Sequence, residues 1–144
     1  MTPGEPIIKK EITMSDANVA RLEHVNLTVP DAKATAAMLC RLFGWHVRWE
    51  GPALGNGHTV HVGNQVSYLA VFTPPAEPNA ASFDKMRTGH LNHVGVVVDD
   101  LDATEARVKA EGHEPYSHDD YEPGRRFYFK DENGIEFEVV SYGR

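Results

Sequence analysis

The sequence has very little cysteine and no long apolar run. Its single cysteine, Cys40, excludes an internal disulfide framework, which fits a reducing cytoplasm. No stretch is apolar for long enough to span a membrane, and the N-terminal residues lack the charged-then-apolar pattern of a signal peptide. We therefore expect a cytoplasmic protein with no membrane partner.

Positive charge is scarce as well. Lys and Arg together number 14 against 21 for Asp and Glu, which gives a net charge of −7. The acidic residues are spread along the chain, and this argues for solubility and against a polyanionic partner such as nucleic acid. Hydrophobic residues make up 41% and charged residues 24%, the proportions of an ordinary globular protein.

What the sequence does contain is an internal repeat. Residues 22–31 (LEHVNLTVPD) and 91–100 (LNHVGVVVDD) are identical at five of ten positions, and a histidine stands third in each. Each segment reads as a strand rich in β-branched residues, followed by an Asp that can cap a helix. A repeat of this kind indicates two copies of one structural unit.

Each copy is predicted to contain a strand, a helix and three further strands. In the first copy we expect a strand at 21–29, a helix at 32–43, and further strands at 45–50, 58–62 and 66–73. In the second copy we expect a strand ending at 98, a helix from 101 to about 112, and strands at 113–118, 125–130 and 135–142. Asn133-Gly134 is the strongest hairpin signal. The order βαβββ, found twice, predicts an α+β fold.

We expect a single domain over residues 20–144. Its modules would span 20–74 and 90–144, with a proline-containing linker at 75–89. Together they would form a curved mixed sheet around a central cavity, with the helices outside. Residues 1–19 carry two prolines and no sustained periodicity, so we expect a mobile arm there.

Two histidines and a glutamate occupy related positions in the two copies. His24 and His93 are equivalent by the repeat, and alignment of the last strand of each module sets Glu138 against Ala70. If the modules are related by approximate twofold symmetry, His24, His93 and Glu138 point to one site. Two imidazoles and one carboxylate are the ligand set of non-haem Fe²⁺ sites, and they also suit Ni²⁺, Zn²⁺ or Mn²⁺. We therefore predict a divalent metal ion, with Fe²⁺ first.

The paired strands and residues 131–138 (DENGIEFE) resemble the vicinal oxygen chelate superfamily, which includes glyoxalase I, bleomycin-resistance proteins, methylmalonyl-CoA epimerase and type I extradiol dioxygenases. The resemblance covers roughly residues 21–142. It implies metal ligands at the three positions just named. Glyoxalase I and the epimerase carry a fourth ligand where this chain has Ala70, so the departure favours the three-ligand pattern of the extradiol enzymes.

The resemblance also implies an active-site tyrosine at Tyr128 that hydrogen-bonds the substrate. The acid–base histidine of the extradiol enzymes is matched here by Tyr68, whose ordinary pKa of about 10 makes it a poor general base. His118 is the candidate for a further acid or base. Either Arg125 or Arg126 is a candidate for holding an anionic substrate group bidentately.

These features predict a divalent-metal-dependent enzyme acting on a small-molecule substrate that chelates through vicinal oxygens. Extradiol-type ring cleavage is slightly favoured over a glyoxalase-like lyase or isomerase reaction. The alternative class is a non-catalytic drug-binding protein of the bleomycin-resistance type. One module pair leaves a concave sheet with an incomplete wall, so we expect a homodimer. The sequence leaves open whether each site takes its ligands from one chain or two.

Overall fold

The computed structural model describes residues 19–76, 84, 86–121 and 124–143. The predicted arm, except for its last residue, and the middle of the predicted linker lie outside the described residues. None of the described helices has the length and apolar character needed to cross a membrane.

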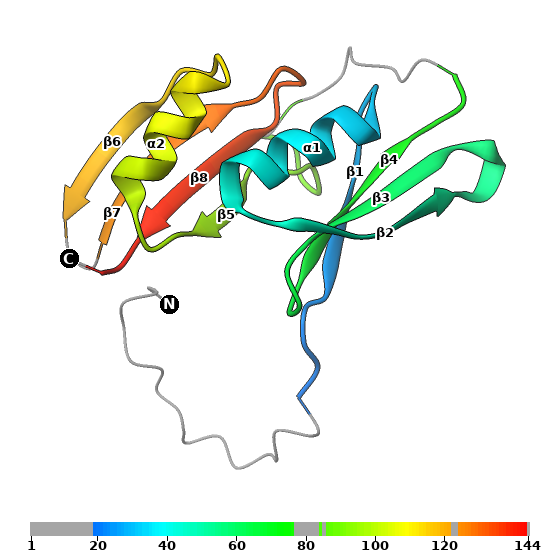
Figure 1. The fold of residues 1–144 in the computed structure, drawn as a ribbon, viewed down its shortest axis with the longest axis horizontal. Helices are drawn as coiled ribbons and strands as arrows, with labels where there is room; N and C mark the ends of the chain where they lie inside the picture. The colour runs from blue at the N-terminus through cyan, green and yellow to red at the C-terminus, as the bar shows by residue number, and fades with distance from the viewer. Residues whose placement is uncertain (1–18, 77–83, 85, 122–123, 144) are drawn as a thin grey trace.

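The chain folds into two modules with the same order of elements (Figure 1). The first module consists of β1 His24–Thr28, α1 Ala32–Phe43, β2 His46–Pro52, the short 3-10 helix η3 Leu54–Asn56, β3 His58–Gly63 and β4 Tyr68–Thr73. The second consists of β5 Val94–Val97, α2 Leu101–Ala110, β6 Tyr116–Tyr121, β7 Gly124–Lys130 and β8 Glu136–Ser141. The predicted α+β class and the twofold βαβββ order are confirmed.

Each module keeps a four-stranded mixed sheet of its own. The strand order is β1-β4-β3-β2 in the first sheet, called sheet A, and β5-β8-β7-β6 in the second, called sheet B. In both sheets the first strand runs parallel to the last, and the other neighbours are antiparallel. Among the described strands none pairs across the two sheets, so β1 and β5 are equivalent edge strands.

The helices begin where the repeat predicts. Asp31 accepts a hydrogen bond from the backbone N–H of Ala34 at 3.0 Å, and Asp100 accepts one from Ala103 at 3.0 Å. Each aspartate thus satisfies a donor that the first helical turn leaves unpaired. Gly44 ends α1 with φ 71°, a left-handed conformation that favours glycine.

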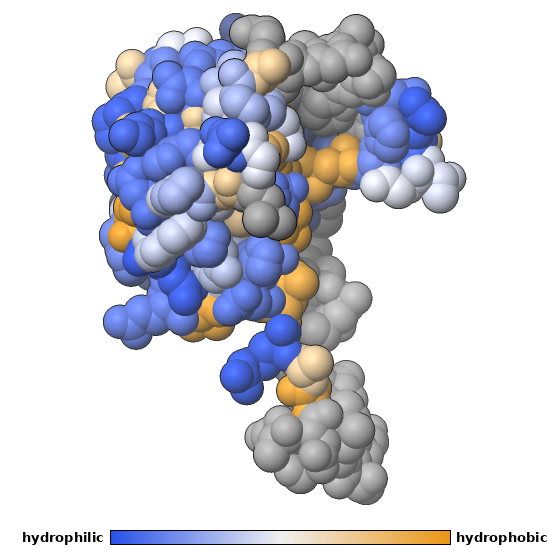
Figure 2. All heavy atoms as spheres, turned by 90° about the vertical axis from the view of Figure 1, so that its right-hand side faces the viewer, coloured by the Kyte–Doolittle hydropathy of each residue, from blue (hydrophilic) through white to orange (hydrophobic). Residues whose placement is uncertain are grey.

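Strand alternation gives each sheet a covered face and an open face. The covered faces carry the fully buried side chains, such as Val60 and Val62 in β3 and Phe137 and Val139 in β8. The helices pack on these faces. On the side of the molecule that carries sheet A, hydrophilic residues predominate and hydrophobic ones form separate small areas (Figure 2).

Helix α1 belongs to the first module but also packs on the second. It lies in the middle of the molecule, between the two sheets (Figure 1). The Phe43 ring lies 6.5 Å from that of Phe129 and 6.2 Å from that of Phe137. Arg107 of α2 donates its Nε–H to the backbone oxygen of Leu42 at 3.0 Å. One hydrophobic core therefore includes residues of both modules.

Candidate metal centre

Two of the three predicted metal ligands are in contact on the open face of sheet B. His93 directly precedes β5, and its Nε2 lies 3.1 Å from Oε1 of Glu138 in β8. Gly95 stands opposite Glu138 in the strand register, and a Cβ added there would meet nothing within 4 Å. The glutamate is 15% exposed and the histidine 33%. The pair is therefore accessible from the open side.

The orientation of His93 is set by its neighbour. Nδ1 of His93 lies 2.7 Å from Oδ1 of Asn92. An amide oxygen only accepts hydrogen bonds, so Nδ1 carries the proton and donates it. Nε2 is the ring nitrogen that faces a carboxylate oxygen of Glu138. An imidazole nitrogen and a carboxylate oxygen this close together are donors of the kind that a divalent metal ion takes, so the donor set fits such an ion.

Arg126 completes the surroundings of Glu138. Its Nη1 donates to Oε2 of Glu138 at 2.9 Å, and both side chains are about 15% exposed or less. Arg126 thus gives this shielded carboxylate a charge-assisted hydrogen bond. Of the two arginines suggested by the sequence, Arg126 is the one at this site.

Tyr128 lies beside the same pair. Its ring stands edge-on to that of His93 at 5.8 Å and lies 6.2 Å from the ring of Tyr116. Tyr116 donates a short hydrogen bond to Glu136, which is buried. Burial raises the pKa of Tyr116, and the hydrogen bond to the Glu136 carboxylate raises it further. The sequence signal for Tyr116 and Glu136 was weak. Glu136 is two residues from Glu138 and shares its strand face, but nothing in the sequence marked Tyr116 as its hydrogen-bond partner.

His24 lies on the open face of sheet A with its own supporting residues. Its Nδ1–H donates to Oε1 of Glu23 at 2.9 Å, and the hydroxyl of Tyr68 donates to the same oxygen at 3.2 Å. The hydrogen bond from His24 lowers the pKa of Glu23. Burial and Glu23 raise the pKa of Tyr68. Tyr68 therefore keeps its proton and helps to position Glu23, and Nε2 of His24 is the ring nitrogen that Glu23 does not engage.

His61, which no sequence motif singles out, also lies on this face. Of the two histidines in β3, His58 pairs with Glu50 at 3.0 Å, and His61 stacks on Tyr68 with ring centroids 4.5 Å apart. Burial lowers the pKa of His61. The two histidines are three residues apart on a strand and so point to opposite faces. That spacing was visible in the sequence, but not which of the two histidines lies on the open face.

The two remaining candidates lie on the helix side of sheet B. Nε2 of His118 lies 2.7 Å from Oε2 of Glu105 in α2, and Arg125 donates to Asp102 of the same helix at 2.9 Å. The structure does not bring His118 or Arg125 together with Glu138.

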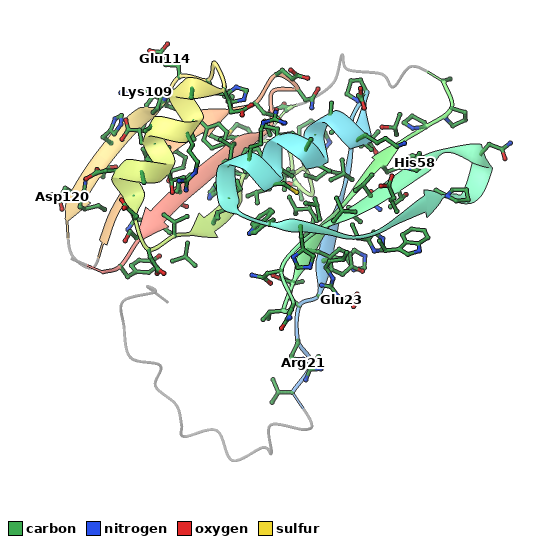
Figure 3. The ribbon with its side chains drawn as sticks, viewed as in Figure 1. Arg21, Glu23, His58, Lys109, Glu114 and Asp120 are labelled. Carbon is green, nitrogen blue, oxygen red and sulfur yellow. The ribbon has the colours of Figure 1, made fainter. Side chains whose placement is uncertain are left out.

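The three predicted ligands form two separate groups within the chain. Among the described residues, no three His, Cys, Asp or Glu side chains lie close enough together to hold one ion. We call His93 and Glu138 the sheet-B half-site, and His24 the sheet-A half-site. Figure 3 shows Glu23, the partner of His24, at the lower end of sheet A, with sheet B on the other side of α1.

Comparison with known proteins agrees with this architecture. Residues 21–139 match a family model described as the Glyoxalase/Bleomycin resistance protein/Dioxygenase superfamily. No curated protein sequence gives a significant match.

Several solved structures share the fold at low sequence identity. A glyoxylase/bleomycin resistance protein/dioxygenase domain from Frankia sp. EAN1pec is 20% identical, with a TM-score of 0.73 over 87% of this chain and 99% of that one. The fosfomycin resistance protein FosX from Listeria monocytogenes, complexed with Mn(II) and sulfate, is 20% identical (TM-score 0.64; 88% and 94% covered). TnmS3, an antibiotic binding protein from Streptomyces sp. CB03234, is 16% identical (TM-score 0.66; 88% and 98% covered).

Proposed function

Because the chain belongs to the glyoxalase/bleomycin resistance protein/dioxygenase superfamily, we propose that it is a divalent-metal-dependent enzyme that acts on a small substrate with vicinal oxygens. His24, His93 and Glu138 are the proposed ligands. Fe²⁺ is the favoured ion, and Ni²⁺, Zn²⁺ and Mn²⁺ are the alternatives. The FosX structure, which contains Mn(II), supports a divalent ion on this fold.

The observation that carries this proposal is the contact between His93 and Glu138. Nε2 of His93 and Oε1 of Glu138, 3.1 Å apart, are a nitrogen and an oxygen donor close enough to bind one ion. Asn92 and Glu23 fix the rings of the two histidines in the same way, through Nδ1. Oxygen acceptors on the distal nitrogen are a common feature of histidines that bind metal.

We infer further that the complete site lies at the interface of a homodimer. The sheet-A half-site of one chain would face the sheet-B half-site of the other. This is supported by the separation of the half-sites within one chain and by the equivalent edge strands β1 and β5. A twofold axis would create two such sites, each with three protein ligands.

The metal ion, when bound, would polarise the vicinal oxygens of the substrate and fix their positions. The chain's own residues have separate tasks. Tyr128 is the proposed hydrogen-bond donor to the substrate, because its ring lies beside His93. Arg126 holds the carboxylate of Glu138 in place, and Tyr68 holds Glu23 against His24. Ala70 supplies no fourth ligand, which favours extradiol-type ring cleavage over glyoxalase-like chemistry.

Metal content tests the proposal directly. Full-length protein purified without chelator should contain, or take up, close to one equivalent of metal per chain, and Glu138→Gln should lose it. A metal content below about a tenth of an equivalent, with no uptake of added Fe²⁺, Ni²⁺ or Zn²⁺, would overturn the proposal of a metal-dependent enzyme. It would favour a binding protein like TnmS3. Oxygen uptake with catechols would indicate extradiol ring cleavage, and turnover of the methylglyoxal–glutathione adduct would indicate a glyoxalase-like reaction.

Mixing two inactive variants tests the shared site. In a heterodimer of His24→Ala and Glu138→Gln chains, one site carries both defects and the other carries neither. Unfolding and refolding an equal mixture should therefore restore metal binding at about a quarter of the sites. Each variant refolded alone should show none. No recovery in a mixture that forms dimers would contradict a site shared between chains.

A further inference from the structure

Arg48 stands at an irregularity in the outer strand of sheet A. Its two neighbours in β2 pair with consecutive residues of β3, Val62 and His61, so Arg48 is an extra residue with no partner of its own in β3. Bulges of this kind change the direction of a side chain, and they are common next to functional sites. Here the exposed Arg48 lies over the open face of sheet A, with its guanidinium carbon 4.4 Å from the centre of the Tyr68 ring.

Two contacts hold this guanidinium in place. Nη1 of Arg48 donates to the backbone oxygen of Asn64 at 3.1 Å, and the Tyr68 ring offers its electron-rich face. Asn64 belongs to the tight turn between β3 and β4. Its Oδ1 accepts hydrogen bonds from the backbone N–H groups of Val66 at 2.9 Å and Ser67 at 3.1 Å. Because the turn is fixed, the arginine loses little further side-chain entropy when a ligand binds.

The other donors of Arg48 are not used within the described residues. None of the carboxylates there forms an ion pair with Arg48, and its Nε and Nη2 have no hydrogen-bond partner. Glu23, the carboxylate on the same face, accepts hydrogen bonds from His24 and Tyr68 instead. Arg48 is thus a cation that is held in position while one edge of its guanidinium stays open.

That open edge has the geometry that binds a carboxylate. Arg41 shows the arrangement within the same chain, where its Nε and Nη2 donate to the two carboxylate oxygens of Glu111 at 2.6 and 2.9 Å. Parallel hydrogen bonds of this kind are strong, and they select for planar anions. The two arginines that the sequence suggested for an anion, Arg125 and Arg126, both pair with carboxylates of the chain, whereas Arg48 presents the same pair of nitrogens to solvent.

Arg48 and the proposed metal ligand His24 lie close to one ring. The centre of the Tyr68 ring is 4.4 Å from the guanidinium carbon and 4.9 Å from the centre of the His24 ring. The guanidinium and the His24 ring can therefore be no further apart than these two distances together. A small molecule can bridge that span.

We propose that the substrate carries a carboxylate a few bonds from its vicinal oxygens, and that Arg48 binds this carboxylate through Nε and Nη2. The proposal rests on the proposed function for the role of His24 as a metal ligand. It adds a charge requirement that the three metal ligands do not impose, and it gives Arg48 the role that the sequence suggested for Arg125 or Arg126.

An acid and its amide test the charge requirement. The compounds 4,5-dihydroxypentanoate and 4,5-dihydroxypentanamide carry the same vicinal diol and have nearly the same shape, but only the first is an anion. In NMR titrations of the full-length protein loaded with diamagnetic Zn²⁺, the acid should bind at least about tenfold more tightly than the amide at low salt. The difference should shrink as salt is added, because Arg48 is exposed to solvent.

Substitutions assign the preference to Arg48. Arg48→Gln should lower the affinity for the acid to that for the amide. Arg48→Lys keeps the charge but loses the paired donors, so it should keep only part of the preference. Arg125→Gln is the matched control, because it removes the same charge from an exposed position on the helix side of sheet B. It should leave both affinities unchanged.

The outcomes separate the two proposals. In a protein that takes up metal, the carboxylate site would be overturned, and the metal enzyme left intact, by equal affinity for acid and amide, by binding of neither, or by a preference for the acid that survives Arg48→Gln. In a protein that takes up no metal, a preference for the acid that is lost in Arg48→Gln would support the carboxylate site and overturn the metal enzyme. Without metal uptake and without a preference, both proposals fail.

Discussion

Glu23 and Asn92 stand at the same position of the two repeats, and each accepts a hydrogen bond from Nδ1 of the histidine that follows it. One is a carboxylate and the other an amide, so the repeat preserves an acceptor rather than a residue type. The preserved feature is the direction of Nε2. That is a requirement of metal ligation and has no obvious use in packing, since both histidines are partly exposed.

Removing the acceptor beside His93 should weaken metal binding. Asn92→Ala frees the imidazole to rotate and to change tautomer, and we expect a loss of about 10- to 100-fold in affinity for Mn²⁺. Asn92→Asp keeps an oxygen in place and should retain most of the affinity. Competition with a chromogenic chelator measures both. Equal affinity for the wild type and Asn92→Ala would show that Asn92 does not orient the ligand.

Arg126 and its neighbour Arg125 provide a matched pair for stability. Arg126→Gln leaves the shielded Glu138 without its cationic partner, and we expect a loss of about 2–3 kcal/mol in the free energy of unfolding of the metal-free protein. Arg125→Gln breaks an exposed pair with Asp102 and should cost much less stability than Arg126→Gln.

Urea denaturation measures both substitutions. Added Mn²⁺ should restore part of the loss in Arg126→Gln, since the ion takes over the neutralisation of Glu138. Equal effects of the two substitutions would mean that Glu138 does not depend on Arg126.

Asp131 should make stability depend on pH. Burial raises its pKa, although Oδ1 accepts hydrogen bonds from the backbone N–H groups of Asn133 and Ile135. The folded state therefore binds the proton more tightly than the unfolded state. This contribution is fully present below the ordinary value of 3.8 and is lost as pH rises through the raised value.

Asp131→Asn cannot ionise and isolates this effect. The wild type should lose stability relative to Asp131→Asn as pH rises above about 4, and the difference should level off once Asp131 is ionised in the folded protein. Thermal unfolding of both proteins across this range measures the difference. A difference that does not change with pH would contradict a raised pKa.

The two helix N-caps, Asp31 and Asp100, should contribute equally to the free energy of unfolding. Asp31→Ala and Asp100→Ala each remove an acceptor from a first-turn N–H, and we expect a loss of about 1 kcal/mol in each case. Asn at either position keeps the acceptor and should stay close to the wild type. Chemical denaturation of the four variants is sufficient. No loss on alanine substitution would mean that water replaces the cap.

Much of the fold was readable because local signals agreed with the repeat. Asp31 and Asp100 predicted two helix starts, Gly44 one helix end, and Asn133-Gly134 the last hairpin, in which Gly134 has φ 83°. Capping and turn chemistry act over a few residues, so the sequence alone reveals them.

The composition of the site was less readable, because it depends on register and on packing between modules. The β6–β7 pairing has a register irregularity between Tyr116 and Asp119, and His118 lies within it, turned to Glu105 of α2. No local signal marks such a bulge. The face of sheet A on which His61 and Trp49 lie likewise depends on how β2 and β3 pair.

The shared core has a consequence for how the chain is made. Phe43, near the end of α1, packs on Phe129 and Phe137, which are synthesised long after it. A nascent first module would hold one side of its helix exposed to solvent until the last strands leave the ribosome. We therefore expect the duplicated halves to fold and unfold in one cooperative transition, and neither half to persist alone. A chain built by repetition has become a single folding unit through one helix.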